Sequence, residues 1–111
     1  MPAAEFLLEH MSRSLFDPVD TTQVASLSPQ LRARVNGEIY RFANPSTRAR
    51  FQRDPVRWCG ILRDPVTGLR FFPSHRSPRL DLTESPYFFV SDSSCRVFRA
   101  DTARYAVHRD Y

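Results

Sequence analysis

The chain has 111 residues, a length that suits one domain with a modest core or two half-size units that share one. All 16 basic residues are arginine, and 12 acidic residues leave a net charge of only +4. This composition favours a GC-rich coding sequence over a dedicated nucleic-acid surface. Without an apolar run of about 18 residues or a signal-peptide pattern, we expect a soluble, cytoplasmic protein with no membrane span.

Residues 1–15 predict an amphipathic N-terminal helix, in which apolar residues recur at helical spacing and charged residues fall between them. Such a face has to be buried, either on the rest of the chain or in a groove of a protein partner. The candidate partner-binding residues, for another protein or for self-association, are Phe6, Leu7, Met11 and Leu15.

A hairpin followed by a helix is predicted for residues 35–58. Asn36-Gly37 separates the segments RARV and EIYRFA, and this dipeptide tolerates the positive φ values of a two-residue hairpin turn. Asn44 can cap a helix over Pro45–Arg53. Pro55 disfavours helical geometry for the residue before it, so this helix ends there and a short turn follows over Pro55–Trp58.

The same pattern recurs 47 residues later. Residues 17–58 and 64–105 share ten identities over 42 pairs without a gap, where unrelated segments would share roughly two or three. We therefore predict an internal duplication. The identical pairs are Asp17/Asp64, Pro18/Pro65, Val19/Val66, Arg32/Arg79, Tyr40/Tyr87, Phe42/Phe89, Ser46/Ser93, Phe51/Phe98, Asp54/Asp101 and Arg57/Arg104.

The second copy is expected to differ in its loops. Strands are predicted at Arg79–Leu82 and Tyr87–Val90, with residues 83–86 (TESP) in place of the Asn-Gly turn. A short strand is expected over residues 69–72. Ser91 or Asp92 caps the second helix, and Asp101 caps the last turn.

The predicted fold class is α+β, with an N-terminal helix at 1–15, a first repeat at 16–62 and a second repeat at 63–111. Units this small are stabilised by burying each other's apolar surface. The expected shared core consists of eight aromatic residues: Tyr40, Phe42, Phe51, Trp58, Tyr87, Phe89, Phe98 and Tyr105.

The repeated pattern resembles the YHS domain, a small metal-binding module related to the TRASH domain. The shared features are Asp-Pro-Val, a hairpin ending in Tyr-x-Phe, a helix with Phe nine residues beyond that Phe, and then Asp-Pro-x-x-aromatic. The likeness covers residues 16–58 well and 63–105 more weakly. It implies cysteine ligands at positions that here hold Asp20, Ala43, Thr47, Thr67, Val90 and Ser94.

None of these six positions holds cysteine, and alanine and valine offer no lone pair to a metal. Some cysteine-free family members have a helix of the form S-x-E-N-R-x-x-F, to which Ser46, Arg48 and Phe51 are similar. We therefore expect two degenerate, metal-free repeats without a cofactor.

The remaining reactive side chains form no recognisable constellation. Cys59 and Cys95 lie at non-equivalent repeat positions and outside any C-x-x-C motif, so reduced thiols are expected. His10, His75 and His108 share no helix face and are expected at the surface. An alternative keeps a zinc or copper site with irregular ligands from Cys59, Cys95, His75 and His108.

No Ser-His-Asp or Cys-His arrangement can be assembled by spacing, and three glycines make no phosphate loop. The expected function is therefore non-catalytic: an interaction or accessory module, either a subunit of a larger assembly or a small regulator. The alternatives are a metal-binding or metal-sensing protein and, third, an arginine-mediated nucleic-acid binder.

Overall fold

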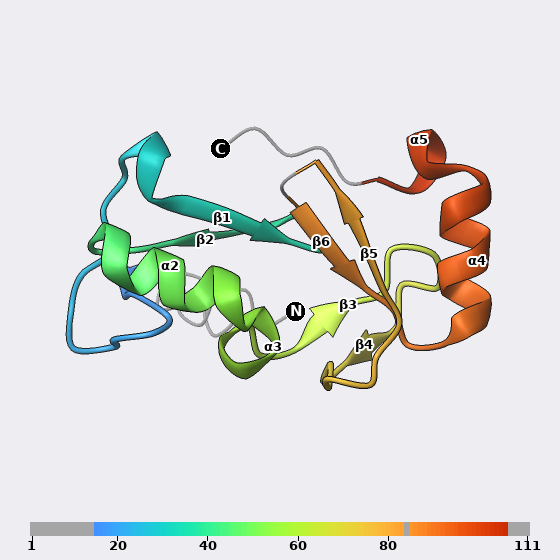
Figure 1. Cartoon of the computed structure of the whole chain (residues 1–111), viewed down its shortest axis with the longest axis horizontal. Coiled ribbons are helices and arrows are strands. Elements are labelled where there is room, and N and C mark those ends of the chain that lie inside the picture. The colour runs from blue at the N-terminus through green and yellow to red at the C-terminus, as the bar shows by residue number, and fades with distance from the viewer. Residues whose placement is uncertain (1–14, 84, 107–111) are drawn as a thin grey trace, which may run out of the picture. The chain divides into compact units, whose positions relative to one another are not determined.

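The α+β fold consists of small hairpins and short helices in the part of the chain that this computed structural model describes, residues 15–83 and 85–106 (Figure 1). In chain order the elements are η1 (Pro29–Leu31), β1 (Arg32–Val35), β2 (Glu38–Arg41), α2 (Pro45–Arg53), α3 (Pro55–Trp58), β3 (Leu62–Arg63), β4 (Arg70–Phe71), β5 (Arg79–Leu82), β6 (Ser85–Phe88), α4 (Asp92–Ala100) and α5 (Thr102–Tyr105).

The strands form three separate two-stranded sheets, β1–β2, β3–β4 and β5–β6. As predicted, β1 and β2 flank a two-residue turn, with φ values of 52° at Asn36 and 78° at Gly37. The tight turn requires the left-handed region, which asparagine and glycine adopt more readily than other residues.

The prediction for the second hairpin was wrong in its turn. Leu82 pairs with Ser85, so the strands close on two residues rather than four, and β6 begins two residues earlier than expected. Thr83 has a φ of 54° and lies 47 residues after Asn36. Pro86 is accommodated within β6 because β6 pairs with β5 alone, so not every residue of β6 has to donate an N–H to a neighbouring strand.

The helix start signals gave the observed boundaries. α2 covers the predicted range, and the Asn44 side chain accepts a hydrogen bond from the Thr47 amide at 3.0 Å. α4 lies 47 residues further on, and its cap is Ser91 rather than Asp92, accepting from the Ser94 amide at 3.2 Å. Strand β3 (Leu62–Arg63) was not predicted. Strand β4 (Arg70–Phe71) is shorter than the strand expected over residues 69–72.

The helix ends also repeat. Asp54 follows α2 with φ −150° and ψ 71°, and Asp101 follows α4 with φ −149° and ψ 70°. Each main-chain N–H bonds back to the carbonyl of a buried phenylalanine, Phe51 at 3.2 Å and Phe98 at 3.1 Å. The Asp101 side chain then accepts from the Arg104 amide, confirming the predicted cap of the last turn.

The described residues fall into two compact units. The first holds residues 15–33 and 40–54, and the second holds residues 34–39, 55–83 and 85–106. The tip of the first hairpin therefore belongs to the second unit, whereas its base belongs to the first. The sequence-based boundaries at 15/16 and 62/63 follow the repeat pattern and stay a prediction.

The core of the first unit is built on the inner face of α2. The Phe51 ring packs on Tyr40 with centroids 4.9 Å apart and on Phe42 with centroids 5.0 Å apart. Phe42 and Phe51 are fully buried, whereas Tyr40 is half-buried.

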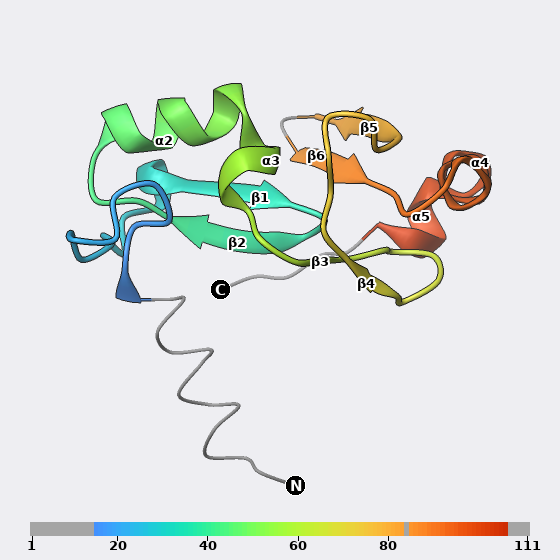
Figure 2. The same ribbon diagram turned by 90° about the horizontal axis from the view of Figure 1, so that it is seen from below.

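The second unit has the same arrangement around Phe98, with α4 beside the β5–β6 hairpin (Figures 1 and 2). Phe98 packs on Tyr87 at 4.8 Å and on Phe89 at 5.1 Å between ring centroids. Cys95 belongs to this cluster, and half-buried Tyr105 packs against it. Trp58 is also half-buried. The expected sharing of one core by both repeats concerns the two units together and stays a prediction.

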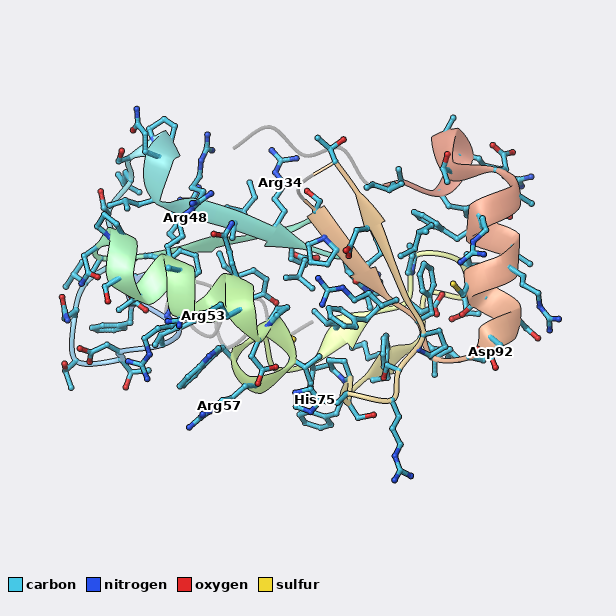
Figure 3. All side chains as sticks on the ribbon, viewed as in Figure 1. Arg34, Arg48, Arg53, Arg57, His75 and Asp92 are labelled. Carbon is cyan, nitrogen blue, oxygen red and sulfur yellow. The ribbon has the colours of Figure 1, made fainter. Side chains whose placement is uncertain are left out.

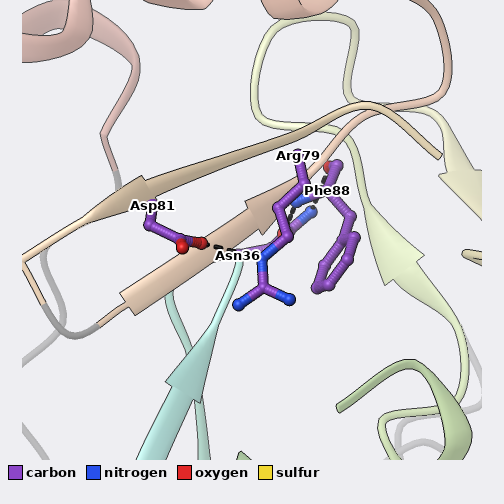
Figure 4. Close-up of polar contacts among 4 residues, drawn as sticks. All are labelled: Asn36, Arg79, Asp81 and Phe88. Carbon is purple, nitrogen blue, oxygen red and sulfur yellow. Dashed lines mark hydrogen bonds and ion pairs between the residues drawn. The ribbon is translucent and has the colours of Figure 1, made fainter. Parts of the chain in front are cut away.

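Asn36 ties the tip of the first hairpin to β6 and β3 within the second unit (Figure 4). Its buried carboxamide accepts from the Phe88 amide at 2.7 Å and donates to the Phe88 carbonyl at 2.9 Å. It also donates to the Arg63 carbonyl at 3.0 Å, and the Asn36 main-chain N–H donates to the Pro86 carbonyl at 3.1 Å. One side chain thus pairs with both polar main-chain groups of Phe88, as a neighbouring strand would.

Candidate functional site

Each repeat is organised around one buried aspartate. In the first unit Asp17 is fully buried, and one carboxylate oxygen accepts from the amides of Val19 at 2.8 Å and Asp20 at 3.1 Å. The other oxygen accepts from the Ala43 amide at 2.9 Å and from the Thr47 hydroxyl. The carboxylate joins the Asp-Pro-Val turn to the end of β2 and the first turn of α2.

Asp64 repeats this network in the second unit. It accepts from the amides of Val66 at 2.8 Å, Thr67 at 2.9 Å and Val90 at 2.9 Å, and from the Ser94 hydroxyl at 2.7 Å. Burial opposes its ionisation and is the largest single influence, but the four donors together outweigh it. They hold the pKa of Asp64 below its ordinary value.

The residues at the positions that the YHS resemblance assigns to metal ligands donate hydrogen bonds to Asp17 or Asp64 instead. Ala43 and Val90 donate main-chain N–H groups, and Thr47 and Ser94 donate hydroxyls. The side chains at the other two positions, Asp20 and Thr67, form hydrogen bonds within the turns. Asp20 accepts from Thr22 and Gln23, and these bonds lower its pKa. The Thr67 hydroxyl accepts from the Leu69 amide at 3.2 Å. These side chains are therefore engaged in local structure.

The alternative metal ligands were Cys59, Cys95, His75 and His108. Both cysteines are buried and lie outside any disulfide, and burial raises the pKa of Cys59 to about 11, well above that of a nucleophilic thiol. His75 is exposed in the β4–β5 loop (Figure 3), and His10 and His108 lie outside the described residues. No group of three or more His, Cys, Asp or Glu side chains that could hold a metal occurs within residues 15–83 and 85–106. The metal-free state stays a prediction.

Of the four candidate partner-binding residues, Leu15 alone is described, and about half of its surface is exposed. It adjoins an antiparallel bridge between Phe16 and Val24, and its carbonyl accepts from the Ala25 amide at 2.8 Å. Phe16 is 42% exposed and Val24 is 66% exposed. We call Leu15, Phe16 and Val24 the N-terminal apolar patch. The predicted residues Phe6, Leu7 and Met11 lie outside the described residues.

Sequence reasoning missed four features of these sites, namely the aspartate networks, the role of Asn36, and the contributions of Phe16 and Val24. The repeated Asp-Pro-Val was visible, but its carboxylate partners lie 26 and 30 residues away along the chain. Val24 lies in a largely polar segment, DTTQVASLSPQ at residues 20–30, where a single apolar residue predicts no contact. Only the bridge to Phe16 brings it next to the N-terminal segment.

Several arginines have structural contacts. Arg48 Nε donates to the Arg32 carbonyl at 2.7 Å, and the guanidinium of Arg57 lies 4.7 Å from the Trp58 ring centroid. Arg79 lies 5.3 Å from the Phe88 ring centroid and pairs with Asp81 at 2.8 Å. Figure 3 shows Arg34 on β1 and Arg53 at the end of α2.

No helix in the described part of the chain is long and apolar enough to cross a membrane. No model of a known protein family matches the chain, and neither does any curated protein or solved structure. The resemblance to the YHS domain, the non-enzymatic reading and the cytoplasmic location therefore stay predictions.

Proposed function

We propose that this protein is a non-catalytic interaction module, serving as a subunit of a larger assembly or as a small regulator. The observation that carries the proposal is the N-terminal apolar patch. The bridge sets the exposed side chains of Phe16 and Val24 next to each other, and exposed Leu15 immediately precedes Phe16, directly after a segment whose sequence predicts an apolar helix face. Contiguous exposed apolar surface on a small domain is typical of a binding site.

The chemistry of the buried polar groups supports the same proposal. The carboxylates of Asp17 and Asp64 are each surrounded by four donors, so their proton-accepting lone pairs are used in the fold. The raised pKa keeps the Cys59 thiol protonated at neutral pH. Acid–base or nucleophilic catalysis needs groups poised in the opposite way.

Helix-in-groove or helix-on-patch docking is the proposed mode. In this reading Phe6, Leu7, Met11 and Leu15 form one apolar face, and Phe16 and Val24 extend it. The competing arrangement has residues 1–14 packed on this chain's own patch. Docking on a partner and packing on this chain predict different effects on folding and association when residues 1–14 are removed.

The test compares the full chain with a chain that lacks residues 1–14. Docking requires the shortened protein to keep its far-UV circular dichroism and thermal transition, while self-association in sedimentation velocity, or capture of the partner from the native source, is lost. Loss of the cooperative transition would instead show that the segment belongs to the fold of this chain.

A pair of variants in the full chain tests the patch itself. Val24→Ser should weaken the same association, because it removes apolar surface that is 66% exposed before binding. Leu27→Ser is the matched control, since Leu27 is also exposed in the first unit but lies outside the Phe16–Val24 bridge. Equal effects of both variants would contradict the proposal.

A further inference from the structure

The β3–β4 hairpin of the second unit has two faces of opposite character. Its register pairs Leu62 with Phe71 and Arg63 with Arg70. Opposed residues of an antiparallel pair lie on the same face, and successive residues alternate between faces. Leu62 is fully buried, so its face is the inner one. Arg63 and Arg70 are exposed and make up the outer face.

The same register extends this outer face with two apolar side chains. Continued one step past the Leu62–Phe71 pair, just outside the two strands, this register sets Ile61 opposite Phe72. Ile61 lies two residues from Arg63, and Phe72 lies two residues from Arg70. Residues two apart on a strand share a face. Ile61 is 37% exposed and Phe72 is 75% exposed. The outer face therefore carries an arginine pair beside an aliphatic–aromatic pair.

Arg63 and Arg70 carry like charges and stand opposite each other across the strand pair. Like charges directly opposed across a strand pair repel each other. Among the described residues neither guanidinium forms an ion pair, whereas Arg79 on the next hairpin is paired with Asp81. The acidic side chain nearest in sequence, Asp64, is buried and accepts hydrogen bonds from four other groups. A carboxylate placed between Arg63 and Arg70 would remove this repulsion and receive charge-assisted hydrogen bonds.

We propose that the outer face of β3–β4 binds an extended segment of a partner protein in which an acidic residue and a large apolar residue stand two positions apart. Alternate side chains of an extended peptide recur every ~6.6 Å, the same spacing as the two pairs on this face. A carboxylate can thus sit over Arg63 and Arg70 while the apolar side chain two residues along the peptide sits over Ile61 and Phe72. This surface is separate in sequence from the N-terminal apolar patch, and the proposal does not depend on that patch.

The composition of the face favours a peptide over single-stranded nucleic acid. Nucleic-acid surfaces of this kind offer aromatic rings to successive bases, and here a single exposed ring lies beside an aliphatic side chain. An apolar peptide side chain packs equally well on both. Nucleic-acid binding is therefore included as an outcome that would overturn the proposal.

Binding is measured by fluorescence anisotropy with the full chain and short labelled probes. A peptide of Glu-Ser-Leu-Ser repeats, the Glu–Leu peptide, presents Glu and Leu in turn on one side and should bind. Peptides of Lys-Ser-Leu-Ser or Glu-Ser-Ser-Ser repeats should bind about tenfold more weakly or worse, since each lacks one of the two contacts. An oligothymidine is the fourth probe. No detectable binding of the Glu–Leu peptide, or tighter binding of the oligothymidine that depends on Phe72, would overturn the proposal.

Matched variants locate the site. Arg63→Gln with Arg70→Gln should weaken Glu–Leu binding about tenfold or more, whereas Arg96→Gln with Arg99→Gln removes the same charge from exposed positions of α4 and should have little effect. Phe72→Ser should weaken binding, and Leu69→Ser, an exposed change in the same hairpin but outside this face, should not. Equal losses in the test and control variants, with all thermal transitions intact, would contradict the proposed site.

Discussion

Asp64 can keep its negative charge in a fully buried position because three main-chain amides and one hydroxyl point at its carboxylate. A carboxylate buried without such donors would cost several kcal/mol or take up a proton. The same arrangement around Asp17 ties the start of the first repeat to α2. The two networks explain why both copies begin with aspartate and carry a hydroxyl residue in the first helical turn.

The first prediction concerns pH and Asp64. Its folded-state pKa lies below the unfolded value of about 3.9, so the stabilisation is fully present above that value and is lost as the pH falls through the folded pKa. Asp64→Asn should lower the free energy of unfolding by about 1–3 kcal/mol at pH 7, because an amide cannot accept from all four donors. Urea denaturation at pH 7 and at pH 3 should show that the deficit relative to wild type shrinks in acid.

The control for this prediction is Asp81→Asn, which removes an exposed charge paired with Arg79 and should change stability by about 0–1 kcal/mol. If the deficit of Asp64→Asn stayed constant between pH 7 and pH 3, the ionised carboxylate would not be the source of the stabilisation.

A second residue-scale prediction concerns Asn36. Asn36→Ala removes three side-chain hydrogen bonds, leaves the buried Phe88 amide without its acceptor, and places an ordinary residue at a φ of 52°. The expected loss is about 2–4 kcal/mol in the free energy of unfolding. Asn36→Gly separates the two causes, because glycine tolerates the backbone conformation but lacks the carboxamide. Stability of Asn36→Ala within ~0.5 kcal/mol of wild type would contradict this account.

At the scale of elements, the nine-residue helices α2 and α4 each contribute one phenylalanine that packs on the hairpin beside it. Phe98 on α4 contacts Tyr87 and Phe89 of the second hairpin, and both of its ring contacts recur around Phe51 in the first unit. The helices have only nine residues, too few to be stable alone in water. Their persistence therefore depends on these aromatic contacts.

The third prediction follows from this dependence. Phe98→Ala should cost about 3–5 kcal/mol, because it removes a fully buried ring and leaves a cavity between α4 and β6. Thermal unfolding followed by far-UV circular dichroism measures the loss. Phe72→Ala is the matched control, since most of that ring is already exposed to solvent and its removal should be nearly neutral. Comparable losses in both variants would mean that the Phe98 contacts do not hold the helix.

The sequence was sufficient wherever the structure depends on neighbouring residues. Asn44 before Pro45 located the start of α2, and Pro55 located its end and the start of α3. The prediction of the turn in the second hairpin failed because Thr83 adopts a left-handed conformation that a β-branched residue rarely takes. Nothing local in TESP signals that turn, whereas the 47-residue alignment with Asn36 does.

The candidate sites were harder to predict, because they depend on pairings between distant segments. The role of Asn36 rests on bonds to a residue 52 positions away. The outer face of β3–β4 depends on a register that sets Arg63 opposite Arg70, and neither residue stands out in a chain with 16 arginines. In the N-terminal apolar patch, Leu15 was visible by its helical spacing, but Val24 was not.

At the scale of the whole molecule, the fourth prediction is that the protein needs no bound metal for its stability, as expected of two degenerate repeats. The positions that the YHS resemblance assigns to metal ligands carry residues that donate hydrogen bonds to Asp17 and Asp64. A chelator should therefore leave the melting temperature unchanged, because structural metal sites contribute much of the folding free energy where they exist. Differential scanning calorimetry with and without EDTA measures this. Zinc or copper that survives dialysis in stoichiometric amount would support the irregular Cys/His site instead.

The last prediction concerns the two repeats expressed separately. A chain of residues 63–111 begins after Leu62, a fully buried residue of the second unit, and also lacks Asn36, which pairs with both main-chain groups of Phe88. A unit of fewer than 50 residues, without a disulfide or metal, has little apolar surface to spare. We therefore expect this chain to show no cooperative thermal transition, whereas the full protein unfolds cooperatively.

Longer fragments distinguish the loss of Leu62 from the loss of Asn36 as the reason for the expected instability of residues 63–111. A chain of residues 55–111 restores Leu62 and all of β3 but still lacks Asn36, and a chain of residues 34–111 restores both. Stability should rise along this series, with cooperative unfolding first recovered when residues 34–39 are present, because they belong to the second unit. A cooperative transition in residues 63–111 alone would show that the second repeat is an independent domain and that the hairpin tip of the first repeat is dispensable to it.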